Sequence, residues 1–188
     1  MLVRQLFRLL VIVCLASAVL TALQGTKASK TADNTSDLAA SMKFIQEALN
    51  AVGQVKYIVH GHDTTSGSDW TNSFSNEARL VAADPTACRI TYHYKVVRDG
   101  NVLMDANAGF LLKDVRDVDV LTRQKYFDEA NLLNGHPSWT AKVEPVVFVV
   151  RVRRPANVEN QFVFLDEATA NHVAKALTHA VEICSNKK

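Results

Sequence analysis

The sequence lacks the short motifs that mark the commonest catalytic and nucleotide-binding sites. It has no Gly-x-Ser-x-Gly nucleophile elbow, and the loop GHDTTSG at residues 61–67 has no lysine to contact a phosphate. The acidic cluster of Asp114, Asp117 and Asp119 has neither the glycine nor the terminal glutamate of a calcium loop. No motif therefore indicates an enzyme.

An excess of one charge is also missing. The chain has 21 Lys and Arg against 19 Asp and Glu, and residues 1–25 contain two arginines, Arg4 and Arg8, and no acid. The remainder is therefore formally neutral. Without a basic surface, nucleic acid is not an expected partner.

No hydrophobic run is long enough to cross a membrane. The run LLVIVCLASAVL has 12 residues, whereas a membrane-spanning helix needs about 20. Two arginines before this run and small residues at Ala16 to Ala18 are typical of a cleaved export signal. We predict a signal peptide at 1–25, a flexible polar linker at 26–35 and a single globular domain at 36–188, located in the periplasm or outside the cell. The alternative is a retained leader that tethers the domain to a membrane.

Few cysteines are present, and Cys14 would be removed with the signal. Cys88 and Cys184 remain, an even count that favours one disulfide bridge in an oxidising compartment. The alternative is a pair of buried thiols.

The patterns that are present predict a helix, seven antiparallel strands and a second helix. Apolar residues recur with helical spacing from Ser36 to Gly53 and from Asp166 to Cys184. Between these segments apolar and polar residues alternate, as in half-buried strands, and Leu80 is expected to face inward with Trp70 and Phe74. The strands are expected within VKYIVHGHD, WTNSFSNEARLVA, CRITYHYKVVR, VLMDA, FLLKDVRDVDVL, VVFVVRVRR and QFVFL.

The predicted fold class is α+β: a seven-stranded antiparallel split barrel or sandwich with an N-terminal helix and a C-terminal amphipathic capping helix. This order of elements resembles the pleckstrin-homology-like superfold over residues 54–184. The resemblance implies the fold alone, because the first hairpin loop, GHDTTSGSDW, has no lysine or arginine for a phosphoinositide. The end of the chain, ATANHVAKALTHAVEIC, also resembles the ends of uncharacterised exported bacterial proteins, which implies no activity.

Three histidines form the one candidate metal site. His60, His62 and His93 are predicted to lie on polar faces of strands, and three imidazoles are a common ligand set for catalytic zinc. In a meander, His60 and His93 would lie two strands apart, about 9.5 Å. A solvated polar face is therefore favoured, and no metal or cofactor is expected. A small metal-dependent hydrolase that uses these histidines is the alternative function.

Two further surfaces stand out. The aspartates Asp114, Asp117 and Asp119 are expected to pair across strands with Arg151, Arg153 and Arg154.

The segment 122–142 is longer than a connection between strands requires. It contains a predicted helix from Lys125 to Leu133 and five large apolar residues, namely Tyr126, Phe127, Leu132, Leu133 and Trp139.

These five residues either cover an open barrel edge or form a surface for a ligand or a protein partner. We therefore predict an exported, non-enzymatic binding or scaffolding domain. Its expected partner is an unknown protein or a small apolar ligand, with no nucleic acid and no membrane span after the signal is cleaved.

Overall fold

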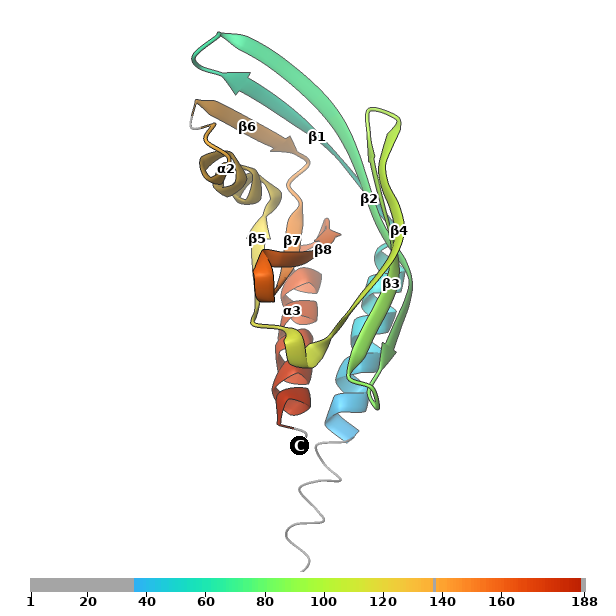
Figure 1. Ribbon diagram of the computed structural model, residues 1–188. Coiled ribbons are helices and arrows are strands. Elements are labelled where there is room, and N and C mark those ends of the chain that lie inside the picture. Colours follow the sequence, from blue (N-terminus) through green and yellow to red (C-terminus); the bar gives the residue numbers. More distant parts are fainter. Residues whose placement is uncertain (1–35, 137, 187–188) are drawn as a thin grey trace, which may run out of the picture. The chain divides into compact units, whose positions relative to one another are not determined.

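The computed structural model describes residues 36–136 and 138–186, which form an α+β fold with two antiparallel sheets (Figure 1). The predicted leader and linker lie outside the described residues. The larger sheet has the strand order β4 (Asn101–Leu111), β3 (Arg89–Arg98), β2 (Ser68–Asp84), β1 (Gln54–Asp63) and β6 (Trp139–Glu144). The smaller sheet has the order β5 (Asp117–Thr122), β7 (Phe148–Arg154) and β8 (Val158–Phe164).

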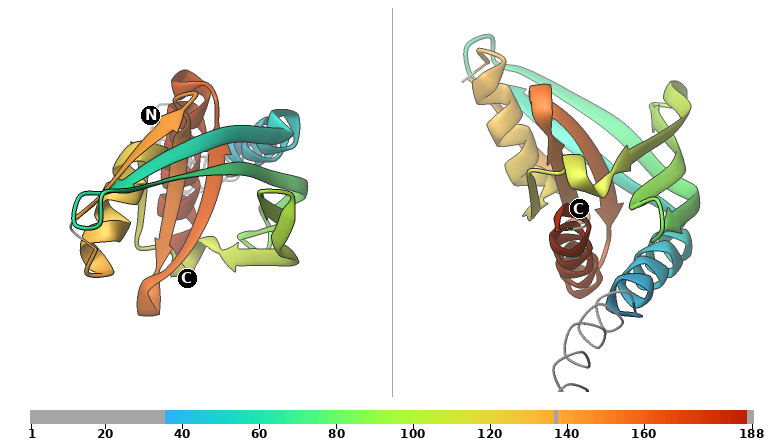
Figure 2. Two further views of the ribbon diagram at one scale, coloured as in Figure 1. Left: turned by 90° about the horizontal axis from the view of Figure 1, so that it is seen from above. Right: turned by 60° about the horizontal axis from the view of Figure 1, so that its bottom comes forward.

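The larger sheet is strongly curved, and its concave side faces the smaller sheet and the helices α2 (Arg123–Leu133) and α3 (Glu167–Ser185) (Figure 1). Seen from above, the strands of the two sheets cross (Figure 2). Short 3-10 helices, η1 (Leu112–Asp114) and η2 (Pro155–Asn157), lie in two of the connections. None of the described helices is both long and apolar enough to span a bilayer.

The main core lies between the two long helices and the sheets. The N-terminal helix runs through residues 36–52 and ends before Gly53, whose positive φ of 63° suits the glycine. The predicted apolar stripe of this helix is confirmed, because Leu38, Met42, Ile45 and Leu49 are all buried. The stripe of α3 is buried in the same core from Ala170 to Cys184. Both helices are therefore held by one amphipathic face.

A second, smaller core underlies the candidate site. It consists of inward residues of β1 together with valines of three later segments, namely Val55, Tyr57, Val59, Val143, Val147 and Val163. The alternation expected for VKYIVHGHD is confirmed here, because every second residue of β1 from Val55 to Val59 is buried.

The predicted α+β class is confirmed. In place of the predicted single split barrel or sandwich of seven strands, the strands divide into sheets of five and three that do not close into a barrel. The described residues form eight strands, where seven were expected. The additional strand, β6, begins within the long segment 122–142, where no strand was expected, and pairs with β1. The run FLLKDVRDVDVL is not one strand: its first two residues end β4, η1 turns the chain, and β5 begins at Asp117.

The expected inward position of Leu80 is wrong. A bulge between Arg79 and Ala82 adds a residue to β2, so that Leu80 is 76% exposed and Val81 is buried in its place. The side-chain amide of Asn50 bonds to the backbone at the bulge, donating to Val81 O at 3.0 Å and accepting from Val81 N at 2.9 Å. The helix thus supplies the hydrogen bonds that the bulged strand cannot obtain from its neighbour.

The predicted disulfide is confirmed. Cys88, in the turn between β2 and β3, is bonded to Cys184 near the end of α3, with 5.9 Å between their Cα atoms. The bond joins segments 96 residues apart and ties the larger sheet to the C-terminal helix. Such a bond is consistent with an oxidising compartment.

Candidate functional site

The β1–β2 hairpin forms one wall of the candidate site. Alternate residues of a strand share a face, so that Ser68, Trp70, Asn72 and Phe74 of β2 point to the same side of the sheet. The hairpin turn is closed by Asp63, whose carboxylate accepts hydrogen bonds from Thr65 N at 2.9 Å and from the Ser66 hydroxyl at 2.8 Å. Both hydrogen bonds lower the pKa of Asp63, and the bond from Thr65 N has the larger effect. The turn is therefore fixed by a charged side chain.

The absence of a side chain at Gly61 leaves the space that the Trp70 ring occupies. The two residues are direct cross-strand partners, and the Trp70 indole ring occupies the space in which a Cβ atom at position 61 would lie. A glycine inside a strand often marks such a close approach. The indole consequently lies across β1 and forms part of the wall.

Helix α2 forms the opposite side and is attached to β6 through side-chain amides. Thr122 caps the helix by accepting from Lys125 N at 3.2 Å. The Gln124 amide then bonds to β6 as a neighbouring strand would, accepting from Val143 N at 3.1 Å and donating to Ala141 O. Gln124 thereby bonds to backbone groups on the free edge of β6, the last strand of the larger sheet.

Stacked rings and a buried arginine hold Phe127 on the inner face of α2. Phe74 stacks on Tyr57 with centroids 5.4 Å apart and lies 6.2 Å from Phe127. The Arg123 guanidinium lies 5.0 Å from the centre of the Phe127 ring and 5.6 Å from that of Tyr57, within cation–π range. Arg123 Nη1 also donates to Gln161 at 2.8 Å. The position of Phe127 is therefore set from beneath.

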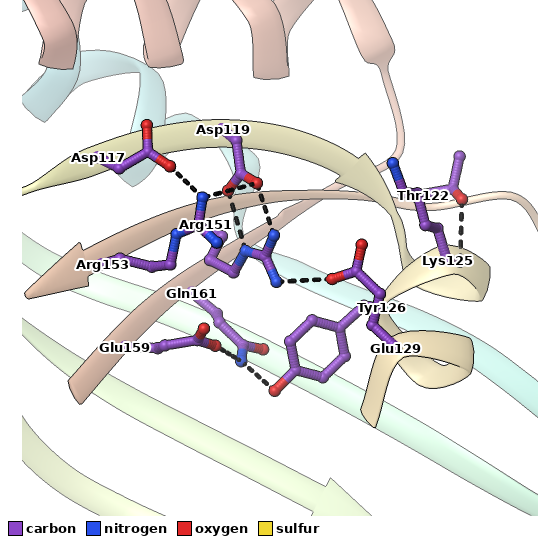
Figure 3. A network of polar contacts seen from close by, with 10 residues as sticks. All are labelled: Asp117, Asp119, Thr122, Lys125, Tyr126, Glu129, Arg151, Arg153, Glu159 and Gln161. Carbon is purple, nitrogen blue, oxygen red and sulfur yellow. Dashed lines mark hydrogen bonds and ion pairs between the residues drawn. The ribbon is translucent and has the colours of Figure 1, made fainter. Parts of the chain in front are cut away.

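An ion-pair network ties α2 to the smaller sheet (Figure 3). Arg151 on β7 donates to both carboxylate oxygens of Asp119 on β5, at 3.0 and 2.6 Å, and to Glu129 on α2 at 2.9 Å. Burial alone would raise the pKa of Asp119, but the hydrogen bonds and charge of Arg151 outweigh it, so that the pKa lies below its ordinary value. The hydrogen bonds with Asp119 raise the pKa of Arg151.

The predicted cross-strand ion pairs are thus confirmed for two of the three aspartates. Arg153 pairs with Asp117 and lies 3.6 Å from Asp119. Within the described residues, Asp114 and Arg154 form no ion pair. Because the network includes Glu129 of α2, it positions this helix as well as joining β5 to β7.

These parts enclose a groove of about 460 Å³, a volume within the range of small-molecule sites. Its apolar walls are Trp70, Phe74, Phe127, Trp139 and Ala141, and its polar lining is Asp63, Ser68, Asn72, Arg98 and Asn131. His136 stacks on Trp139 with ring centroids 4.2 Å apart. The groove can hold an apolar group between aromatic faces.

Searches of protein-family models, curated proteins and solved structures find no match for this chain. The site must therefore be interpreted from its own residues.

The structure brings together two of the five residues predicted for a ligand or partner surface. Phe127 and Trp139 line the groove. Tyr126 lies elsewhere on α2 and accepts a hydrogen bond from Gln161 at 2.7 Å. Leu132 and Leu133 are 68% and 87% exposed at the end of α2 and do not line the groove.

The three histidines of the alternative metal site are not brought together. His60 lies opposite Thr71 on β2, whereas His93 lies opposite Arg79, eight residues further along that strand. This offset is about 26 Å, much more than the 9.5 Å expected for a simple meander. Each imidazole contacts polar neighbours instead, namely Thr71 for His60, Asp69 for His62, and Asp105 and Asn107 for His93. No metal-binding group of three or more His, Cys, Asp or Glu occurs in the described part of the chain.

The sequence interpretation missed three residues that shape the site. Trp70 and Phe74 were assigned an inward face but no binding role, and Gly61 was not singled out. A glycine in the middle of an alternating strand was the available signal for Gly61, because a side chain or ligand commonly approaches such a position. Arg98 also lines the groove, but it can be placed there only when the register between β2 and β3 is known, and the periodicity of the sequence does not give that register.

Proposed function

We propose that this protein is an exported, non-enzymatic binding domain that holds a small apolar ligand in the aromatic groove. The observation that carries the proposal is the shared position of Trp70 and Trp139 on the walls of a 460 Å³ groove. An apolar ligand that enters it removes aromatic surface from water, which is the main source of affinity in such sites.

The way in which the walls are fixed supports a binding role. Trp70 is placed by Gly61, and Phe127 by the rings and guanidinium beneath it. A wall that is already ordered costs little conformational entropy when a ligand binds. The preformed groove therefore favours a ligand site over a surface that merely covers a sheet edge.

Export is supported by two separate features. The disulfide between Cys88 and Cys184 is typical of proteins from oxidising compartments, and the first 25 residues have the composition of a signal peptide. The pleckstrin-homology-like resemblance stays a prediction from element order and contributes nothing to the proposed function.

The proposal is tested with N-phenyl-1-naphthylamine, a neutral apolar dye that fluoresces when it leaves water. We expect saturable binding of one dye per chain. Trp139→Ala should weaken binding by up to about tenfold, because one aromatic contact contributes roughly 0.5–1.5 kcal/mol. Phe44→Ala is the matched control, since Phe44 is a partly exposed aromatic residue outside the groove.

Two results would contradict the proposal. The first is the absence of saturable dye binding. The second is an equal affinity of the Trp139→Ala and Phe44→Ala variants, which would place the dye elsewhere. A purified protein partner that binds the wild type and not Trp139→Ala, while no apolar dye binds, would assign the groove to protein recognition instead.

A further inference from the structure

One end of the groove carries a positive charge that has no counter-ion. Arg98 is the direct cross-strand partner of Phe74, so both side chains lie on the groove face of the sheet. Among the described residues, no carboxylate lies within 4.0 Å of the Arg98 guanidinium. The adjacent carboxylate of Asp99 accepts instead from the backbone N–H and the hydroxyl of Ser73, at 2.6 and 3.1 Å. Arg98 is therefore free to meet an anion.

The other end of the groove carries a negative charge. Asp63 lies there, and the bonds that its carboxylate receives from Thr65 and Ser66 lower its pKa and keep it ionised. An anion at this end would be repelled, whereas at the Arg98 end it would be attracted. The two ends thus impose one orientation on a ligand with a single charged group.

The distance between the ends indicates an elongated ligand. The groove follows β2 from Ser68 to Phe74, and six residues of extended strand span about 20 Å. Aromatic side chains line the length between the two charged ends. A linear apolar chain matches this shape better than a compact ring system does.

We propose that the ligand is an elongated amphipathic monoanion, an apolar chain that ends in a carboxylate. The carboxylate binds Arg98, and the chain lies between the four aromatic side chains toward the Asp63 end. This inference rests on the proposed function and adds the chemical class of the ligand and its direction in the groove.

The test uses intrinsic fluorescence, because the chain contains two tryptophans and both line the groove. The probes are decanoate, 1-decanol and decyltrimethylammonium, which share a chain and differ in charge. We expect decanoate to bind about twofold to fivefold more tightly than 1-decanol, a difference within the range for an exposed ion pair. Decyltrimethylammonium should bind most weakly. The preference for decanoate should shrink in 0.5 M NaCl, since salt screens exposed charges.

Arg98→Gln tests the assignment of the charge. This variant should lose the preference and bind decanoate and 1-decanol with equal affinity. Arg79→Gln is the matched control, because Arg79 is an exposed arginine of the same sheet outside the groove, and it should retain the preference for decanoate.

The outcomes separate this inference from the proposed function. Equal binding of decanoate and 1-decanol by the wild type, or tightest binding of decyltrimethylammonium, would overturn the carboxylate assignment while leaving an apolar site. An unchanged preference in Arg98→Gln would overturn the role of Arg98. Failure of all three probes to change the fluorescence would overturn the proposed function and this inference together.

Discussion

Trp70 and Gly61 are direct partners on neighbouring strands, and the indole ring occupies the space that a side chain at position 61 would need. Gly61 is buried beneath this ring. The hairpin therefore pairs a residue that weakens strands with the largest side chain, and the groove wall depends on this pair.

Gly61→Ala should displace Trp70. The added methyl group overlaps the ring, and overpacking of this kind typically costs about 1–3 kcal/mol. In a Trp139→Phe background, where Trp70 is the only tryptophan, the emission maximum should shift to longer wavelength and the urea midpoint should fall. Ile58→Ala, at an exposed position of the same strand, is the control. An unchanged emission maximum in the Gly61→Ala variant would show that Trp70 does not need this space.

Gln124→Met should loosen β6 from α2. The substitution keeps the length of the side chain but leaves Val143 N and Ala141 O without their amide partner. The loss should be about 1–3 kcal/mol, and the Val143 amide should exchange with solvent faster in hydrogen-exchange NMR. The control is Gln54→Met at an exposed site on β1. Equal exchange of Val143 in both variants would contradict this role of Gln124.

Arg151→Met should make stability less sensitive to acid. Arg151 lowers the pKa of Asp119 in the folded state. In the unfolded chain the pKa of this carboxyl group is about 3.9. Ionised Asp119 therefore stabilises the fold above that pH, and this stability is lost as the pH falls through the lower pKa of the folded state. The wild type should therefore lose stability between about pH 5 and pH 3 more steeply than the variant.

At pH 7 the same variant should be about 1–3 kcal/mol less stable, a value reduced from that of a fully buried pair because Asp119 and Glu129 are partly exposed. Urea unfolding at a series of pH values measures both effects, with Arg89→Met at an exposed position as the control. Parallel pH profiles for wild type and Arg151→Met would contradict the assignment.

Removal of the disulfide should lower stability without changing the groove. The bond closes a loop of 96 residues, for which the chain-entropy model gives about 4–5 kcal/mol. The Cys88→Ala, Cys184→Ala double variant and the reduced wild type should have the same lowered urea midpoint. A double variant as stable as the oxidised wild type would show that the bond adds nothing to stability.

The helices and most of the strands can be predicted from local patterns. The N-terminal stripe of Leu38, Met42, Ile45 and Leu49 repeats at helical spacing, and β1 alternates residue by residue. The disulfide follows from the cysteine count and the predicted export signal. The helices and strands depend on residues close in sequence, and the disulfide depends on the number of cysteines and the compartment.

The remaining features depend on contacts between distant segments. The pairing of β6 with β1 joins Val143 to Val59, and nothing in WTAKVE indicates that partner. The bulge at Leu80 depends on Asn50, about thirty residues earlier. The groove needs the pairing of β6 with β1 together with the placement of α2. Periodicity can therefore identify Trp139 and Phe127 as candidates but cannot show which other residues surround them.

Contact quenching by 11-bromoundecanol tests the central claim most directly. This neutral chain carries a bromine atom that quenches tryptophan on contact, and both tryptophans of the protein line the groove. A chain bound between Trp70 and Trp139 predicts saturable quenching with one ligand per protein, abolished by Phe127→Glu at a position that lines the same groove. Quenching that rises linearly with concentration and is equal in Phe127→Glu would show only random collisions and would contradict a ligand site in this groove.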